Sequence, residues 1–389
     1  MINRYRIQNF KSIRDVTVDF APVTVLVGKS GVGKSNLVDS IRLLRNCLLQ
    51  TEEIKNVVQS NWQSLLPASN SGSVPRFEVE FSIEGMDQTY RYDLELSAAG
   101  PFHPPTEERL RLGDQCLFHQ KLDVEKQSNK QTWLVPPSLI NVPGPGPLAI
   151  SRIPSIFEVV IAYTALTSGI GCYKFNDRVL TLPPTQTKRK SEHGLNDDGS
   201  NYLESLREIV KNLQDLGVRK QIVSVLQRIN PSVSAVELND ILNPTHVVVG
   251  HSFNGKTLPL NLSQESDGFR RFYAHLLALF QRPPKQTNIF EHPEDGIHPG
   301  ALGLLAEEFQ LAPDDGRGQV ILTTHSPRLL DAFGAEQIRA VQLINFETQV
   351  GMIAAEQQES IRDGLLLPGE LLTVDPARVS AISVNEFGE

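Results

Sequence analysis

The strongest restriction on the fold of this chain is a glycine-rich loop, GKSGVGKS, at residues 28–35. The loop matches the pattern GxxxxGK[ST] and follows a short apolar run, Val23–Val27. Beyond it, apolar residues recur with spacings of four, three and four, which places them on one helical face: Leu37, Ile41, Leu44 and Leu48. A strand, a glycine-rich loop and a helix in this order predict an α/β fold with a phosphate-binding loop.

Each part of this loop is suited to holding a nucleoside triphosphate. The glycines let the backbone curl so that successive N–H groups point at phosphate oxygens, and the helix start adds a positive dipole end. Lys34 is expected to reach the β- and γ-phosphates, and the Ser35 hydroxyl is expected to coordinate Mg²⁺. The predicted cofactors are therefore ATP and Mg²⁺. The predicted nucleotide-binding residues of the loop are Gly28, Ser30, Gly31, Gly33, Lys34, Ser35 and Asn36.

Length and composition indicate a soluble protein of two or three compact units, or of one large interrupted unit. The chain has 389 residues, and its 40% hydrophobic and 21% charged residues are ordinary for a globular protein. A net charge of −8 argues against broad binding to nucleic acid or to a membrane, although a local basic patch such as Lys188-Arg189-Lys190 stays open. Three cysteines without CxxC spacing suggest neither a disulfide framework nor a zinc cluster. With no signal peptide or bilayer-spanning apolar run, we expect a cytoplasmic location.

Three segments are expected along the chain. An N-terminal half at 1–135 holds the loop and an antiparallel β subdomain, a linker and helical lobe occupy 136–245, and a C-terminal half follows at 246–389. Strict alternation of apolar residues at 77–83 and 90–96 predicts an antiparallel hairpin in the first segment.

The boundaries of these segments rest on changes in pattern. A proline- and glycine-rich stretch at 136–147 supports neither a helix nor a central strand. Helical spacing of apolar residues at 203–213 and 222–229 predicts the helical lobe. Strands and helices then alternate again, and three apolar runs are predicted as strands of the α/β core: Val247–Val249, Ile289–Phe290 and Val320–Leu322.

Three further motifs follow the loop in the chain. Ser266-Asp267-Gly268 opens a predicted helix, an apolar strand ends in Glu291, and a second apolar strand ends at His325. Taken singly, each has a plain structural explanation as a helix cap, a solvated loop or a packed side chain. What is informative about function is that all three follow the glycine-rich loop in this order.

Together these motifs resemble the ABC-type ATPase heads of the RecF, SMC and OLD-like ATPases. The resemblance covers most of the chain, from IQNFKSI through LNDDGSNYLESL, SDGFRRF and EHPEDGIHP to TTHSP. It implies a P-loop NTPase head of the ABC type, with a mixed central sheet, an antiparallel β subdomain and a helical insertion lobe.

The resemblance also implies roles for matching residues. Glu291 stands at the position of the Walker B carboxylate that helps hold Mg²⁺, and His325 at that of the switch histidine near the γ-phosphate. Ser266, Asp267 and Gly268 match the signature, which meets ATP bound to another subunit, and Arg271 is the basic residue that often follows it. Residues 295–299 match the D-loop at the interface between heads. Asn9 to Ser12, with Lys11 among the predicted nucleotide-binding residues, match the turn near the base and ribose.

One position departs from the family pattern. Relatives usually carry a second acid after the Walker B carboxylate, and this chain has His292. A neutral imidazole can accept a proton, but nearby phosphates favour its protonated form, which is not a base. Glu294 could substitute, although Pro293 restricts its reach. The sequence therefore predicts ATP hydrolysis that is slow or stimulated by a partner, with ordinary turnover through His292 as the alternative.

The expected function is that of an ATPase that dimerises through nucleotide. A site shared between loop and signature requires a homo-oligomer of at least two heads. The length leaves no room for an SMC coiled coil or, after His325, for the Toprim nuclease domain of OLD proteins, so we expect a separate effector such as a nuclease, acting in prokaryotic anti-phage defence. The alternatives are a RecF-like DNA repair ATPase in contact with nucleic acid, a non-hydrolysing ATP-dependent scaffold, and a metal-dependent nuclease built from Glu291, His292, Glu294, Asp295, His298 and His325.

Overall fold

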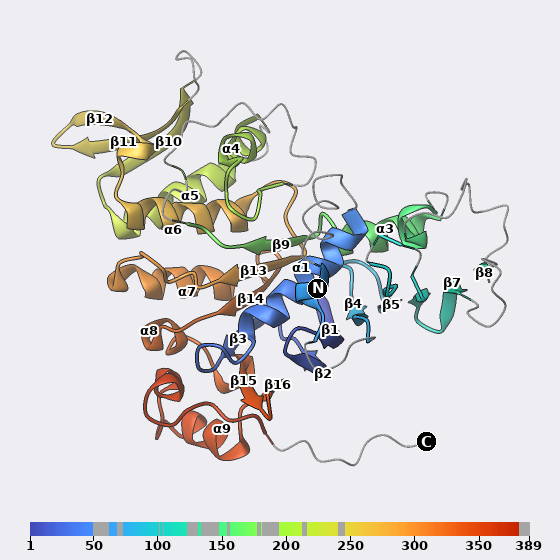
Figure 1. Cartoon of the computed structure of the whole chain (residues 1–389). Coiled ribbons are helices and arrows are strands. Elements are labelled where there is room, and N and C mark those ends of the chain that lie inside the picture. The colour runs from blue at the N-terminus through green and yellow to red at the C-terminus, as the bar shows by residue number, and fades with distance from the viewer. Residues whose placement is uncertain are drawn as a thin grey trace. The chain divides into compact units, whose positions relative to one another are not determined.

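A computed structural model gives the elements labelled in Figure 1. The residues that it describes are 1–49, 62–67, 73–100, 102–103, 105–122, 131–133, 148–153, 156–176, 180, 194–211, 216–239 and 246–380. The predicted boundary at 136–147 and the basic run at 188–190 lie outside the described residues.

Two units divide the chain. Unit 1 comprises Met1–Ile170 and Gly334–Glu389, and unit 2 comprises Gly171–Phe333. This division differs from the three sequence segments because strand β15 (Ile338–Ile344) pairs in parallel with β3 (Val23–Val27), which joins the C-terminal part of the chain to unit 1.

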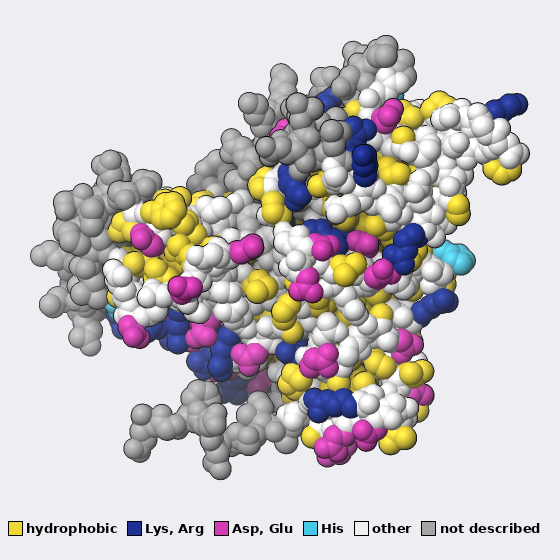
Figure 2. Space-filling view, turned by 180° about the vertical axis from the view of Figure 1, so that it is seen from behind, with side chains coloured by type: hydrophobic (Ala, Val, Ile, Leu, Met, Phe, Trp, Pro, Cys, Tyr) yellow, Lys and Arg dark blue, Asp and Glu magenta, His cyan; other side chains and the backbone are white. Residues whose placement is uncertain are grey.

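The described surface is mixed in charge. On the face shown in Figure 2, Lys and Arg side chains are interspersed with Asp and Glu side chains. No helix among the described residues is both long enough and apolar enough to cross a bilayer.

Unit 1 contains a seven-stranded antiparallel sheet in the order β2-β1-β4-β5-β6-β7-β8. Its strands are β1 (Ile2–Phe10), β2 (Ile13–Asp19), β4 (Arg76–Phe81), β5 (Tyr90–Glu95), β6 (Glu107–Leu112), β7 (Gln115–Leu122) and β8 (Gln131–Trp133). The predicted hairpin is confirmed as β4 and β5, with Phe77 opposite Leu94.

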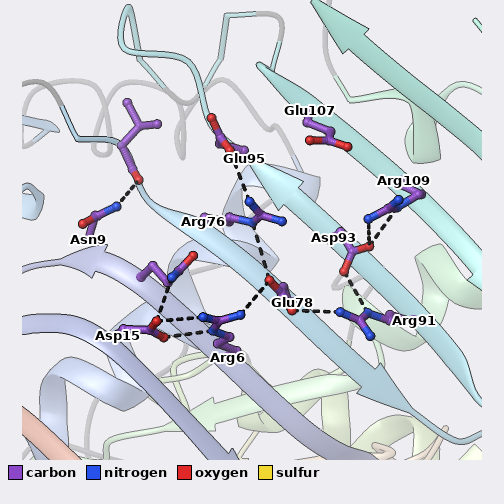
Figure 3. Close-up of polar contacts among 12 residues, drawn as sticks. Arg6, Asn9, Asp15, Arg76, Glu78, Arg91, Asp93, Glu95, Glu107 and Arg109 are labelled. Atoms are coloured by element: carbon purple, nitrogen blue, oxygen red, sulfur yellow. Dashed lines mark hydrogen bonds and ion pairs between the residues drawn. The ribbon is translucent and has the colours of Figure 1, made fainter. Parts of the chain in front are cut away.

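The two faces of this sheet differ in chemistry. Alternate residues on its inner face are buried and apolar, among them Ile7, Phe77, Val79, Leu94 and Leu110. The other face carries a network of ion pairs across the strands (Figure 3). In it, Arg6 of β1 pairs with Asp15 of β2 at 2.7 Å and with Glu78 of β4 at 3.3 Å. The period-2 pattern of the sequence thus separates core from ionic surface.

The strands β16-β15-β3 form the second sheet region of unit 1. Every residue of β3 is buried, and β15 pairs antiparallel with β16 (Glu347–Met352). Helix α1 (Lys34–Leu49) follows β3 and buries the four apolar residues that define its predicted face. Unit 1 also contains the helices α3 (Phe157–Leu166) and α9 (Ala355–Arg362).

Unit 2 contains strands of two kinds. Strands β13 (Thr287–Glu291) and β14 (Gln319–Thr323) pair in parallel, and β9 (Ile170–Tyr173) lies next to β13. The helices are α4 (Tyr202–Lys211), α5 (Leu216–Ile229), α6 (Asp267–Phe280), α7 (Leu302–Leu311) and α8 (Pro327–Leu330). From Phe269 to Phe280 every residue of α6 is buried, as is typical of a helix in a core.

A separate antiparallel sheet corrects one sequence prediction. Strands β10 (Val233–Asn239), β11 (His246–Phe253) and β12 (Lys256–Asn261) form a three-stranded sheet beside α5 (Figure 1). The run Val247–Val249 belongs to β11 of this sheet and not to the α/β core, so that assignment was wrong. Three apolar residues in a row do not reveal which sheet a strand joins.

Candidate nucleotide site

The glycine-rich loop in unit 1 connects the end of β3 to the start of α1. Gly33 has a φ of +106°, and a Cβ built on it would lie 2.1 Å from Oγ1 of Thr348. At Gly28 a Cβ would lie 2.1 Å from the carbonyl oxygen of Val341. Any larger residue at these two positions would push the loop away from β15 and β16, which pack behind it.

The loop presents donors for an anion. Lys34 is buried, and its Nζ donates to the carbonyl oxygens of Gly28 at 2.7 Å and Lys29 at 2.9 Å. The backbone N–H groups from Ser30 to Gly33 donate no hydrogen bond to any residue in the described part of the chain. Free N–H groups beside a helix start and a half-buried Ser35 fit the phosphates of a magnesium nucleotide.

A chain of side-chain hydrogen bonds connects the glycine-rich loop to Ser12 and Thr348. Asn36 Nδ2 donates to Ser12 Oγ at 2.7 Å, and Ser12 Oγ lies 2.6 Å from Thr348 Oγ1. Thr348 in turn donates to the carbonyl oxygen of Val32 at 3.0 Å. The sequence motifs did not point to Thr348, and they grouped Asn36 with nucleotide-binding residues although its amide here donates to Ser12.

The turn after β1 brings Lys11 to helix α1. Its Nζ lies 2.7 Å from Oδ2 of Asp39 and 5.4 Å from the centroid of the Phe10 ring. Asn9 and Lys11 both have positive φ, which shapes the turn. The ammonium group of Lys11 thus already has a carboxylate partner. The nucleotide contact predicted for Lys11 stays a prediction.

In unit 2, the segment Ser266–Gly268 opens helix α6. Ser266 is the N-cap residue, and its Oγ accepts the N–H of Phe269 at 3.3 Å. A Cβ on Gly268 would lie 3.0 Å from the carbonyl oxygen of Gly296. The structure therefore brings this segment against the turn at 295–299, and the close approach requires a residue as small as glycine.

Arg271, one turn into α6, is held inside unit 2. Its guanidinium is buried and donates to the carbonyl oxygen of Phe175 at 3.2 Å. It also packs against Gly296, where a Cβ would lie 2.8 Å from Nε. Arg271 thus contacts the same turn, 295–299, that Gly268 approaches.

The ends of β13 and β14 bring three predicted residues together. Glu291, which is buried, ends β13 opposite Thr323, and β14 ends there, two residues before the predicted end at His325. His292 has a φ of +49°, and its N–H donates to the carbonyl oxygen of Thr323 at 3.1 Å. The rings of His292 and His325 stack with centroids 4.9 Å apart and planes 10° apart.

Glu294 connects this pair of histidines. Its Oε1 accepts the backbone N–H of His325 at 2.6 Å and lies 4.0 Å from His292 Nδ1. Its Oε2 is buried and has no hydrogen-bond partner in the described structure. Within the described ranges, no three His, Cys, Asp or Glu side chains form a group that could hold a metal ion.

Comparison with known proteins identifies the family. Residues 23–331 match the AAA_21 family, whose description is "AAA domain, putative AbiEii toxin, Type IV TA system". The chain is 23% identical over 365 residues to the Old nuclease of Escherichia phage P2. That alignment covers 84% of this chain and 56% of the nuclease, so the chain spans little more than half of that relative.

Solved structures of similar fold are heads of SMC proteins. A crystal structure of an Smc head bound to the C-winged helix domain of ScpA matches with a TM-score of 0.56 at 13% identity, covering 92% of this chain and 99% of that chain. The Smc head domain from Pyrococcus furiosus, with an extended coiled coil and bound to the C-terminal domain of ScpA, gives 0.52 at 12% identity, covering 94% and 99%. The chain belongs to the AAA_21 family of P-loop ATPases and has the ABC-type head fold of the RecF, SMC and OLD-like ATPases.

Proposed function

We propose that this protein binds Mg²⁺–ATP at the loop 28–35, associates with a second copy through the bound nucleotide, and switches a separate effector. The observation that carries the proposal is the loop itself. It combines unpaired N–H groups, the buried ammonium of Lys34 and the start of α1, which together suit a phosphate group.

Each predicted residue receives a role in this proposal. Lys34 binds phosphate oxygens, and Ser35 and Glu291 hold Mg²⁺, which when bound supplies positive charge to the phosphates. His325 lies near the γ-phosphate. Ser266 to Gly268 contact the ATP of the second head through a hydroxyl and the N–H groups of a helix start.

The surroundings of His292 favour slow hydrolysis. Its ring is stacked on His325, and its backbone is held in the left-handed region by Thr323. Oε1 of Glu294 accepts the N–H of His325, so only its buried Oε2 is left to act as a substitute base. A switch that holds ATP for a long time would keep an assembly in place until a partner supplies the missing stimulus.

Anti-phage defence is the context that we propose. The family description names the AbiEii toxin, and the phage relative is a nuclease, so a nuclease is the effector chemistry that we favour. The mixed charge of the face in Figure 2, with the net charge of −8, supports a protein partner over broad contact with nucleic acid. Purification of the tagged chain with ATP from its native host tests this, and recovery of the chain with no nuclease would contradict it.

Single-turnover hydrolysis tests the switch. We expect His292→Glu to raise the rate about tenfold or more over wild type, because a positioned general base contributes roughly 10²–10⁴-fold. Lys34→Ala is the control, and it should bind no ATP. A wild type as fast as His292→Glu would refute slow switching. A chain that assembles with ATP yet releases no phosphate, even with its partner, would instead be a scaffold.

A further inference from the structure

A partly buried histidine joins the three-stranded sheet of unit 2 to the residue before the segment Ser266–Gly268. Nε2 of His251, on β11, lies 2.6 Å from Oε1 of Glu265. Nδ1 of the same ring lies 2.7 Å from Oγ of Ser232, at the start of β10. The His251 and Glu265 side chains are 11% and 9% exposed. Three segments distant in sequence therefore meet at one imidazole.

Hydrogen bonds around Ser232 hold the hydroxyl group that faces this imidazole. Oδ1 of Asn230 accepts the backbone N–H of Ser232 at 3.2 Å and the Ser232 hydroxyl at 2.8 Å. On the other side of the ring, Nε2 of His251 faces Oε1 of Glu265, and a carboxylate oxygen accepts hydrogen bonds.

The ring of His251 is therefore held between the Ser232 hydroxyl and the carboxyl group of Glu265. A charge-assisted hydrogen bond of this kind, shielded from water, is stronger and more directional than a neutral one. It holds the side chain of Glu265 in one position against β11.

The backbone of the same segment is fixed independently. Arg270, in the first turn of α6, donates from its guanidinium to the carbonyl oxygen of Glu265 and pairs with Asp267. The N–H of Asn261 donates to Gln264 Oε1 at 2.8 Å, closing the short turn before Glu265. Arg270 ties the segment to its own helix, whereas His251 ties it to the sheet.

We propose that His251 and Glu265 are positioning residues that set the segment Ser266–Gly268 for contact with the ATP of a second head. The inference rests on the proposed function, which gives that segment its role. Neither residue touches nucleotide bound at loop 28–35 of its own chain in this scheme. Loss of the pair should therefore weaken assembly and turnover, and leave ATP binding by a single head unchanged.

Three measurements on the full chain test the pair: affinity for a fluorescent ATP analogue, ATP-dependent association by sedimentation, and hydrolysis. We expect Glu265→Ala to reduce association and hydrolysis about tenfold, as expected for one lost charge-assisted hydrogen bond, with analogue affinity unchanged. Glu265→Gln keeps an acceptor and should recover part of the loss. The matched control is Glu107→Gln, which alters a histidine–glutamate pair of 2.9 Å on β6 and β7 and should behave as wild type.

A direct readout covers the case of a misfolded variant. In the wild-type chain labelled with ¹⁵N-histidine, the resonances missing from His251→Gln should shift in Glu265→Ala, because Nε2 of His251 loses its carboxylate partner. Resonances that do not shift, or a Glu265→Ala variant that associates like wild type, would overturn this inference alone. A wild type that binds ATP without associating would overturn the proposed function and this inference with it.

Discussion

At the scale of single residues, Glu108 on β6 is a carboxyl group with no access to solvent. The hydroxyl of Tyr92 donates to it at 3.0 Å, and the N–H groups of Ala149 and Ile150 donate at 2.6 and 3.0 Å. Burial raises the pKa of Glu108 from its usual 4.5 to about 7, although these hydrogen bonds lower it. The group anchors the short turn Ala149–Ser151 to the sheet.

This raised pKa predicts a pH dependence of stability. Because the folded protein binds the proton more tightly than the unfolded chain, the contribution of Glu108 is full below about pH 4.5 and is lost as the pH rises through about 7. Between pH 5 and 8, the free energy of unfolding of wild type should fall by up to about 3 kcal/mol relative to that of Glu108→Gln. Thermal unfolding of both proteins across this range measures the difference. Parallel curves would show that the carboxyl is already ionised at pH 5.

The residues of the site differ in how far the sequence reveals them. Lys34 and Ser35 could be predicted because motif spacing and flanking elements fix their place. Thr348 could not, because a threonine in a strand is ordinary and its bond to Val32 spans 316 residues. The hydrogen bond from the N–H of His325 to Glu294 could not be predicted either, because the sequence of a turn does not show in which direction a carboxylate side chain points.

At the scale of elements, the ionic face of the seven-stranded sheet depends on Asp93 of β5. Its side chain is 4% exposed and contacts Arg91, Arg109 and Arg111 at 3.1, 3.0 and 3.2 Å. One carboxylate thus lies between three guanidinium groups on two strands. Without it, these three like charges would face one another beside the acidic side chains of β4.

Asp93→Ala should destabilise unit 1 by about 2 kcal/mol, because it leaves several partly buried charges without their shared partner. Glu95→Ala is the matched control on the same strand and face. Glu95 is 28% exposed and pairs only loosely, with Arg76 at 3.8 Å, so its loss should cost less than about 1 kcal/mol. Urea unfolding of both variants compares them, and equal losses would mean that Asp93 is no more than one surface charge among many.

Strands and helices could be predicted where apolar residues repeat regularly over a long stretch of sequence. The alternation in β4 and β5 and the helical face of α1 are both present. The placement of β11 failed because a short apolar run carries no information about its partners. The seven-stranded sheet exceeds the predicted hairpin because β1 pairs with β4 across a long stretch of sequence, and β6 and β7 continue the sheet beyond β5.

At the scale of the whole molecule, the proposed shared site predicts complementation between inactive variants. Lys34→Ala lacks a working loop, and Ser266→Arg lacks a working signature. Mixed in equal amounts, half of the dimers are mixed pairs, and each has one of its two sites intact, so about a quarter of wild-type hydrolysis should return. Each variant alone is the control. A mixture no more active than its inactive components would contradict the shared site, and Ser266→Arg that is active alone would show that one head hydrolyses ATP by itself.

The pairing of β15 with β3 bears on the order in which the protein is made. Strand β3 and the loop leave the ribosome early, but their backing strand and Thr348 are translated roughly 300 residues later. All of unit 2 is synthesised in between. A nascent chain therefore carries the glycine-rich loop without these supports until β15 and β16 have been translated.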